Sequence, residues 1–223
     1  VLIGPGRERR TEGETRATHR IPPDYRPLMT TPSGPDAPLP PPITPDDKNW
    51  TWVLERTCPD CGFDGTTTAA AVVPDLVRAT ADEFVELLAH PHARLRPAAD
   101  QWSALEYACH VRDVFRLYEY RLGLMLDQDD PHFPNWDQDA TAIADRYDLQ
   151  DPATVAVELR DAAASMASAL EAVGPDQWQR TGVRSDGAVF TIDTFTLYFV
   201  HDPIHHLDDV RRGNEILASG ELD

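Results

Sequence analysis

The sequence predicts an all-α protein, an antiparallel four-helix bundle that follows a disordered N-terminal leader. Three observations lead to this prediction. Four segments between residues 74 and 212 carry apolar residues at helical spacing, start and stop signals bound these segments, and strand-like sequence is confined to one short stretch. Amphipathic helices bury their apolar stripes against one another, and four of them in one domain favour a bundle.

The N-terminal region has a different composition from the rest of the chain. Eleven of the 20 prolines fall in residues 1–45, and this stretch has almost no apolar periodicity. Such a segment favours extended backbone and cannot bury enough apolar surface to order itself. We therefore expect a disordered leader over residues 1–47 and one helical domain over residues 48–223.

The first two helices are marked by their starts. The first is expected from Pro74, a favoured first helical residue, to the His90-Pro91 pair that ends it. The second is expected over residues 103–126. It begins with Ser103 and Glu106, which are spaced as a capping box, and its apolar residues recur at helix spacing.

The last two helices are marked at both ends. Asp151-Pro152 indicates the start of the third, which Gly174-Pro175 stops. Residues 183–190 contain Asp-Gly and predict a tight turn or short hairpin, because that pair favours positive φ. The fourth helix is expected over residues 192–212, with Gly213 as its terminator.

Composition excludes several functional classes. Lys and Arg number 20 against 38 Asp and Glu, so the formal net charge is −18. An excess of acid without a basic stripe argues against nucleic-acid and anionic-membrane partners. No apolar stretch approaches the ~20 residues of a membrane span. Three cysteines fit a reducing compartment better than a disulfide framework, so we expect a cytoplasmic protein.

Three histidines form a candidate metal site. His201 and His205 are four residues apart and project from one helix face, close enough to hold a single divalent ion. His110 lies on the inner stripe of the second helix, where a bundle can bring it opposite the fourth. Three imidazoles leave coordination positions open, as a catalytic metal requires. A solvated histidine pair and an ordinary core histidine are the alternatives.

Two stretches resemble a known family. Residues 102–111 (WSALEYACHV) and residues 201–210 (HDPIHHLDDV) are similar to the second-helix and fourth-helix signatures of the DinB/YfiT-like metalloenzymes. The resemblance covers about residues 70–212 and implies a four-helix bundle that binds zinc or nickel. It also implies the ligands His110, His201 and His205. His206 projects about 100° away from His205, and a shift of one residue would exchange their roles.

The same resemblance implies a type of chemistry. Characterised members include low-molecular-weight thiol S-transferases and mycothiol-dependent isomerases, in which a metal-bound thiolate attacks an electrophile. The expected partners are therefore a small-molecule thiol or an electrophile, and metal-assisted hydrolysis is the second expected reaction. The competing hypothesis is a non-catalytic metal-binding or interaction module that can dimerise through its helix faces.

The Cys58–Cys61 pair has the spacing of half a zinc knuckle. Completing the site would require Cys109, or His90 and His92, none of which stands at standard spacing. Two free thiols in a turn, a structural metal site and a redox dithiol are the three interpretations.

Three further residues near the histidines carry expectations. Pro203 should kink the fourth helix or start a new turn capped by Asp202. Glu106 fits a capping role better than a role toward His110. Asp208 is a candidate to orient a metal-bound imidazole, although a solvated carboxylate is the stronger interpretation.

Overall fold

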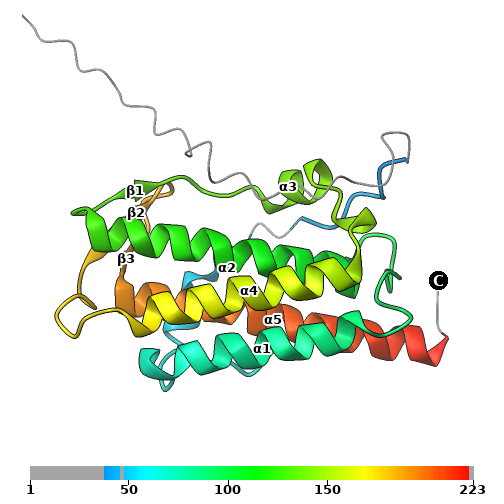
Figure 1. Cartoon of the computed structure of the whole chain (residues 1–223), viewed down its shortest axis with the longest axis horizontal. Coiled ribbons are helices and arrows are strands. Elements are labelled where there is room, and N and C mark those ends of the chain that lie inside the picture. Colours follow the sequence, from blue (N-terminus) through cyan, green and yellow to red (C-terminus); the bar gives the residue numbers. More distant parts are fainter. Residues whose placement is uncertain (1–37, 46–47, 221–223) are drawn as a thin grey trace, which may run out of the picture.

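Four long helices form the body of the protein in a computed structural model that describes residues 38–45 and 48–220 (Figure 1). These helices are α1 (Val73–Leu88), α2 (Ala104–Asp127), α4 (Pro152–Glu171) and α5 (Ile192–Ser219). The prediction of a four-helix bundle is confirmed.

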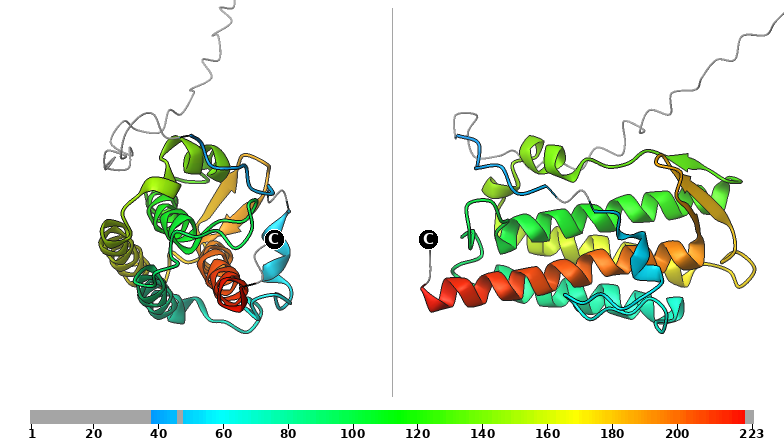
Figure 2. Two further views of the ribbon diagram at one scale, coloured as in Figure 1. Left: turned by 90° about the vertical axis from the view of Figure 1, so that its right-hand side faces the viewer. Right: turned by 180° about the vertical axis from the view of Figure 1, so that it is seen from behind.

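The order of the helices around the bundle differs from their order in the chain. Helix α4 lies between α1 and α2, and α5 completes the ring on the other side (Figure 2). Helices α1 and α5 run in one direction, and α2 and α4 run in the opposite direction (Figure 1). Because α2 and α4 are parallel neighbours, residues 128–151 must return along the bundle, as a long crossover does.

The crossover and the α4–α5 connection build a small sheet at one end of the bundle. Its strands are β1 (His132–Phe133), β2 (Thr181–Arg184) and β3 (Val189–Thr191), in the order β1-β2-β3. Strand β1 pairs parallel to β2, and β2 pairs antiparallel to β3. The predicted hairpin is confirmed, and Gly187 supplies its positive φ of 90°. Strand β1 and the short helix α3 (Gln138–Ala144) were not predicted, because each is too short to show a period.

Local capping explains where the helices begin. Ser103 and Glu106 form the expected capping box at α2, which confirms the capping role of Glu106. Asp151 accepts a hydrogen bond from the Thr154 backbone amide at the start of α4. Thr191 and Thr194 form a second capping box at α5. Each cap satisfies backbone donors that a helix start leaves without intrahelical partners.

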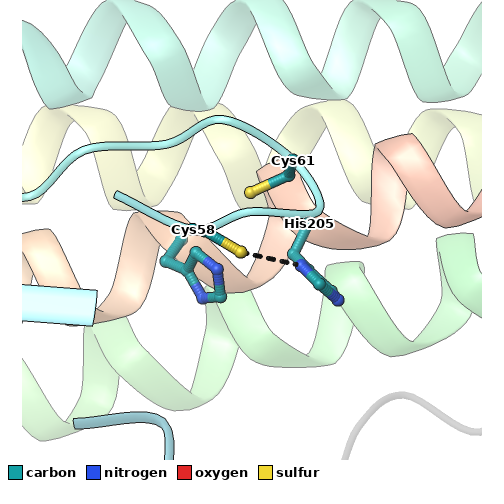
Figure 3. A group of neighbouring side chains, drawn as sticks. Cys58, Cys61 and His205 are labelled. Carbon is teal, nitrogen blue, oxygen red and sulfur yellow. Dashed lines mark hydrogen bonds between the residues drawn. The ribbon is translucent and has the colours of Figure 1, made fainter. Parts of the chain in front are cut away.

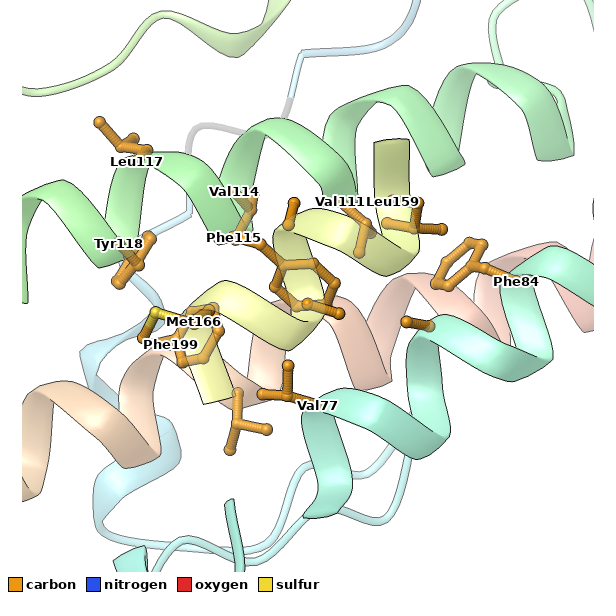
Figure 4. Close-up of a cluster of buried hydrophobic side chains, with 14 of the residues drawn as sticks. Val77, Phe84, Val111, Val114, Phe115, Leu117, Tyr118, Leu159, Met166 and Phe199 are labelled. Carbon is orange, nitrogen blue, oxygen red and sulfur yellow. The ribbon is translucent and has the colours of Figure 1, made fainter. Parts of the chain in front are cut away.

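The apolar stripes of the four helices meet in one core (Figure 4). Phe84 of α1, Phe115 of α2, Leu159 of α4 and Phe199 of α5 are all fully buried. Burying one such side chain stabilises a fold by roughly 1.5–3 kcal/mol. This packing holds the inner faces of α2 and α5 against each other, where the candidate ligands lie.

Helix α5 is longer than predicted. Gly213 does not terminate it, since the helix continues to Ser219 and ends at Gly220, whose φ is 73°. Gly213 is instead a point of close approach, because a Cβ there would lie 3.1 Å from Cγ of Pro97. Pro203 lies inside this one helix, so the expected new turn capped by Asp202 is wrong. Packing on both sides of α5 outweighs the local preference of proline.

The segment before α1 crosses the outer face of the bundle. It contains two short 3₁₀ helices, η2 (Trp50–Leu54) and η3 (Ala70–Val72), and both pack against α5. Most of the expected leader lies outside the described residues. Its described part, residues 38–45, contacts the domain, where the Thr44 amide donates to the Asp100 carbonyl at 3.0 Å. Within residues 38–45 and 48–220, no helix is long and apolar enough to cross a membrane.

Candidate metal centre

Two groups of side chains gather potential metal ligands at the middle of α5. The cysteine–histidine group comprises Cys58, Cys61, His201 and His205, and the His–Asp–His group comprises His110, Asp202 and His206. In each group, one potential ligand atom per residue lies within 4.8 Å of all the others. The two groups together use two pairs of residues at i and i+4 on one helix.

The geometry of α5 explains why there are two groups. Residues advance about 100° around a helix, so the pair 201/205 and the pair 202/206 lie on neighbouring faces. One face is covered by the loop that carries Cys58 and Cys61, and the other meets His110 of α2. The predicted ligands are therefore divided between the groups: His201 and His205 lie with the two cysteines, and His110 lies with Asp202 and His206.

The cysteines are presented by a tight turn between η2 and η3. The amide of Cys58 donates to the carbonyl of Phe63 at 2.7 Å, and the amide of Gly62 donates to the carbonyl of Cys58 at 2.9 Å. Gly62 takes a φ of 75°, which glycine adopts without strain. The turn directs the sulfur of Cys58 toward the ring of His205 and places Cys61 close by (Figure 3). Sγ of Cys58 lies 3.7 Å from Nδ1 of His205.

Burial sets the protonation of this group in the absence of a metal. Burial, together with the neighbouring His205, lowers the pKa of His201 to about 4, so the imidazole is neutral at pH 7. Burial also lowers the pKa of His205, against the opposing effect of Asp209. Burial raises the pKa of Cys61 to about 12, although the backbone amide of Phe63 opposes the rise. Neutral imidazoles are ready to bind a cation, whereas the thiols need one to ionise.

The His–Asp–His group joins α2 to α5. Nε2 of His110 lies 3.3 Å from Oδ1 of Asp202, and Nε2 of His206 lies 3.8 Å from Oδ2 of the same carboxylate. His110 is fully buried and stacks on Trp136, with ring centroids 5.3 Å apart. Its Nδ1 has no hydrogen-bond partner within the described part of the chain. Burial would raise the pKa of Asp202, but His110 and His206 lower it more, so the carboxylate is ionised.

A carboxylate outside the group orients one of its imidazoles. Nδ1 of His206 lies 3.0 Å from Oδ2 of Asp209, which can only accept, so Nδ1 carries the proton and donates. Nε2 of His206 is then the nitrogen with a lone pair directed toward Asp202. Carboxylates hold metal-binding histidines in this way. The orienting residue is Asp209, whereas the expected Asp208 pairs with Arg212.

A cavity of about 510 Å³ opens beside both groups. The α5 residues His201, Asp202, His205 and His206 all line it, together with Trp136, Tyr198 and Arg184. The guanidinium of Arg184 donates to the Tyr198 hydroxyl at 2.8 Å. Two of the three donor residues of the His–Asp–His group, Asp202 and His206, thus border a space large enough for a small molecule, as the ligands of an open catalytic metal site do.

Sequence comparison places this architecture in a family. A profile of the DinB superfamily matches residues 74–210, which is more than half of the chain. The chain belongs to the DinB superfamily. No curated protein matches the sequence.

Structure comparison supports the same fold for this DinB-superfamily chain. The chain is similar to the solved structure of "YfiT from Bacillus subtilis", described as "a probable metal-dependent hydrolase with an unusual four-helix bundle topology". The identity is 18%, the match covers 77% of this chain and 93% of YfiT, and the TM-score is 0.52. A likeness at this identity shows the shared fold.

The other residues considered as zinc ligands beside Cys58 and Cys61 lie elsewhere in the DinB domain. Cys109 is buried, and its thiol lies 3.5 Å from the Gln150 side chain. His90 and His92 contact each other, with ring centroids 5.0 Å apart. Sequence spacing could not reveal that His201 and His205 lie beside the cysteine pair, because no fixed sequence distance joins a loop to a helix face.

Proposed function

We propose that this DinB-superfamily protein is a metal-dependent enzyme in which the His–Asp–His group holds a divalent ion and leaves coordination positions for a small-molecule thiol. The observation that carries the proposal is the convergence of His110, Asp202 and His206 beside a cavity of about 510 Å³. A thiol or its electrophilic partner fits such a space better than a macromolecule does.

The residues present suit a divalent ion. Two imidazoles and one carboxylate are the donor types that bind zinc, nickel and iron at catalytic sites, and zinc or nickel is the pair that the family resemblance favours. The nitrogen of His110 that would bind the ion is Nε2, which faces Asp202 at 3.3 Å. When bound, the ion would lower the pKa of a coordinated thiol and supply a nucleophilic thiolate at neutral pH.

The chain's own residues would bind and orient the reactants. Asp209 fixes the tautomer of His206, and Asp202 supplies the negative charge that attracts a cation. Burial raises the pKa of Tyr198, although Arg184 opposes the rise, so its phenol stays protonated at neutral pH. Because the Tyr198 oxygen already accepts from Arg184, its hydroxyl proton is available to donate to a group in the cavity.

A thiol-binding experiment tests the proposal. Cobalt(II) is loaded into metal-free protein, and mycothiol, coenzyme A and glutathione are titrated in turn. A thiolate that enters the cobalt coordination sphere produces a new sulfur-to-cobalt charge-transfer band. His110→Ala should abolish this band, and the control His90→Ala/His92→Ala should retain it. A spectrum that no thiol changes would contradict the thiol hypothesis and favour hydrolysis or a non-catalytic module.

Metal-assisted hydrolysis is the second candidate. The likeness to YfiT, described as a probable metal-dependent hydrolase, favours it. In that case the open position would hold water, and ester or amide hydrolysis would depend on His110 without any thiol. Assays of model esters with and without thiol separate the two reactions.

We also propose the cytoplasm as the compartment. Cys58, Cys61 and Cys109 are all free thiols in the structure. Cysteines remain reduced in the cytoplasm, where thiol-dependent chemistry also finds its co-substrate.

A further inference from the structure

We propose that the cysteine–histidine group is a second, structural metal site, which binds zinc and fastens the N-terminal segment to α5. This inference is independent of the proposed catalytic function, because it uses a different set of ligands. It assigns a role to the Cys58–Cys61 pair and to the two histidines that the His–Asp–His group leaves out.

The donor set is the first argument for zinc. Two sulfur atoms and two imidazole nitrogens lie within 4.8 Å of one another. Two thiolates with two imidazoles form a common structural zinc site, and four donors complete its tetrahedron. Soft sulfur ligands disfavour magnesium and calcium, which bind oxygen. The chemistry of the group therefore differs from that of the His–Asp–His group, which has no sulfur.

The shape of the cysteine turn is the second argument. Cys58 and Cys61 are held by the hydrogen bonds of the turn, in which Cys58 pairs with both Gly62 and Phe63. The turn thus brings the two sulfur atoms within 4.8 Å of each other, which is the arrangement of half a zinc knuckle.

The burial of the ligands is the third argument. Cys58 is fully buried, and His201 is 4% exposed. Nε2 of His201 is buried and has no hydrogen-bond partner among the residues that the structure describes. The buried thiol of Cys58, the half-buried thiol of Cys61 and an imidazole nitrogen without a partner form no strong hydrogen bonds with one another, whereas a shared cation would satisfy all three.

The surroundings indicate a structural rather than a catalytic site. The indole of Trp50 packs on both histidines, with centroids 5.3 Å from the His201 ring and 4.9 Å from the His205 ring. Phe63 packs on His201 from the loop, at 5.8 Å. Although His201 and His205 also line the cavity, four protein donors would complete a tetrahedral site and leave no position for a substrate.

Zinc at this position would join distant parts of the chain. Cys58 and His205 are 147 positions apart, and the segment around Trp50 also lines the cavity of the proposed catalytic site. His201 and His205 alternate on α5 with Asp202 and His206, so an ion on one pair fixes the rotation of the other. The structural ion would thus hold in place the segment around Trp50, which lines the cavity, and the two α5 ligands Asp202 and His206.

Metal analysis of variants tests the inference on the full chain, purified without a histidine tag. We expect Cys58→Ser/Cys61→Ser to lose about one equivalent of zinc and Cys109→Ser, the matched control, to lose none. His110→Ala should keep this zinc, which separates the inference from the proposed catalytic site. Unchanged zinc content in a folded Cys58→Ser/Cys61→Ser variant would overturn the inference.

If the cysteine variant does not fold, measurements on the unsubstituted protein can still test whether zinc is bound by sulfur. Zinc X-ray absorption should show sulfur scatterers at about 2.3 Å from the ion. Thiol titration should find two cysteines that are protected until a chelator removes zinc. A spectrum with nitrogen and oxygen scatterers alone would overturn the inference, and so would a Cys58–Cys61 disulfide in protein prepared without oxidant, which would indicate a redox pair.

Discussion

Nε2 of His110 lies 3.3 Å from Oδ1 of Asp202, although the two residues are 92 positions apart in the chain. The contact bridges α2 and α5 at the cavity, and both side chains belong to the His–Asp–His group. It shows which face of α5 meets α2: the face of Asp202 and His206 does so, while the face of His201 and His205 meets the cysteine turn. Because consecutive residues of α5, such as His205 and His206, belong to different groups, substituting each of them should affect a different metal site.

Substitution of His205 and of His206 should give different results, although the two residues are consecutive. His206→Ala should remove the ion of the His–Asp–His group and the metal-dependent activity, and it should leave the sulfur-bound zinc in place. His205→Ala should weaken the sulfur-bound zinc site instead. Elemental analysis and zinc X-ray absorption of both variants measure the difference. Loss of the same ion in His110→Ala and His205→Ala, with no effect of His206→Ala, would instead support His110, His201 and His205 as one site.

Asp209→Asn should weaken metal binding without removing a ligand. The Asp209 carboxylate accepts from Nδ1 of His206 at 3.0 Å and fixes the tautomer in which Nε2, on the side of Asp202, carries the lone pair. Loss of such an orienting carboxylate typically lowers metal affinity by ~10–100-fold. Competition with a chelator of known affinity measures the change. Asp208→Asn is the matched control, because Asp208 pairs with Arg212, and equal affinities for the two variants would refute the orienting role.

Asp113→Ala should destabilise the fold. The Asp113 carboxylate accepts from Arg112 at 2.9 Å and also from the Tyr147 hydroxyl, and Arg112 is only 3% exposed. Arg112 keeps its ion pair with Glu158 at 2.7 Å, but the Tyr147 hydroxyl and part of the guanidinium lose their acceptor, and leaving buried polar groups unpaired costs ~1–3 kcal/mol. Urea denaturation measures the free energy of unfolding. The exposed pair of Asp82 and Arg160 provides the control, where Asp82→Ala should change stability by ~0–1 kcal/mol.

Two glycine substitutions should have opposite effects. A Cβ at Gly182 of β2 would lie 2.9 Å from Cγ of Met125 and 2.9 Å from Cε1 of Phe133, both of which are buried. Gly182→Ala should therefore destabilise the fold by ~1–3 kcal/mol, the usual cost of overpacking. A Cβ at Gly123 in α2 would meet nothing within 4 Å. Gly123→Ala should stabilise the helix by up to ~1 kcal/mol. Thermal unfolding measures whether each variant is stabilised or destabilised. Shifts of the unfolding temperature in the same direction for both variants would contradict the packing argument.

The sequence by itself determined the helical part of the fold. Apolar residues at helical spacing predicted α1, α2, α4 and α5, because burial of one helix face requires that period. The capping box of Ser103 and Glu106 and the cap at Asp151 located helix starts, since these bonds form between residues three apart. The sequence also revealed the potential ligands, through the spacing of Cys58 and Cys61 and of His201 and His205.

Only the tertiary structure decided how those ligands combine. Periodicity fixes the spacing of residues along a helix, but the rotation of α5 relative to α2 depends on packing along its whole length. A rotation of about 100° separates His205 from His206, and it decides which of them faces His110. The path of the cysteine turn over α5 and the contact of Gly213 with Pro97 likewise depend on long-range packing. Local sequence fixes what each helix can present, whereas the packed core determines which groups meet.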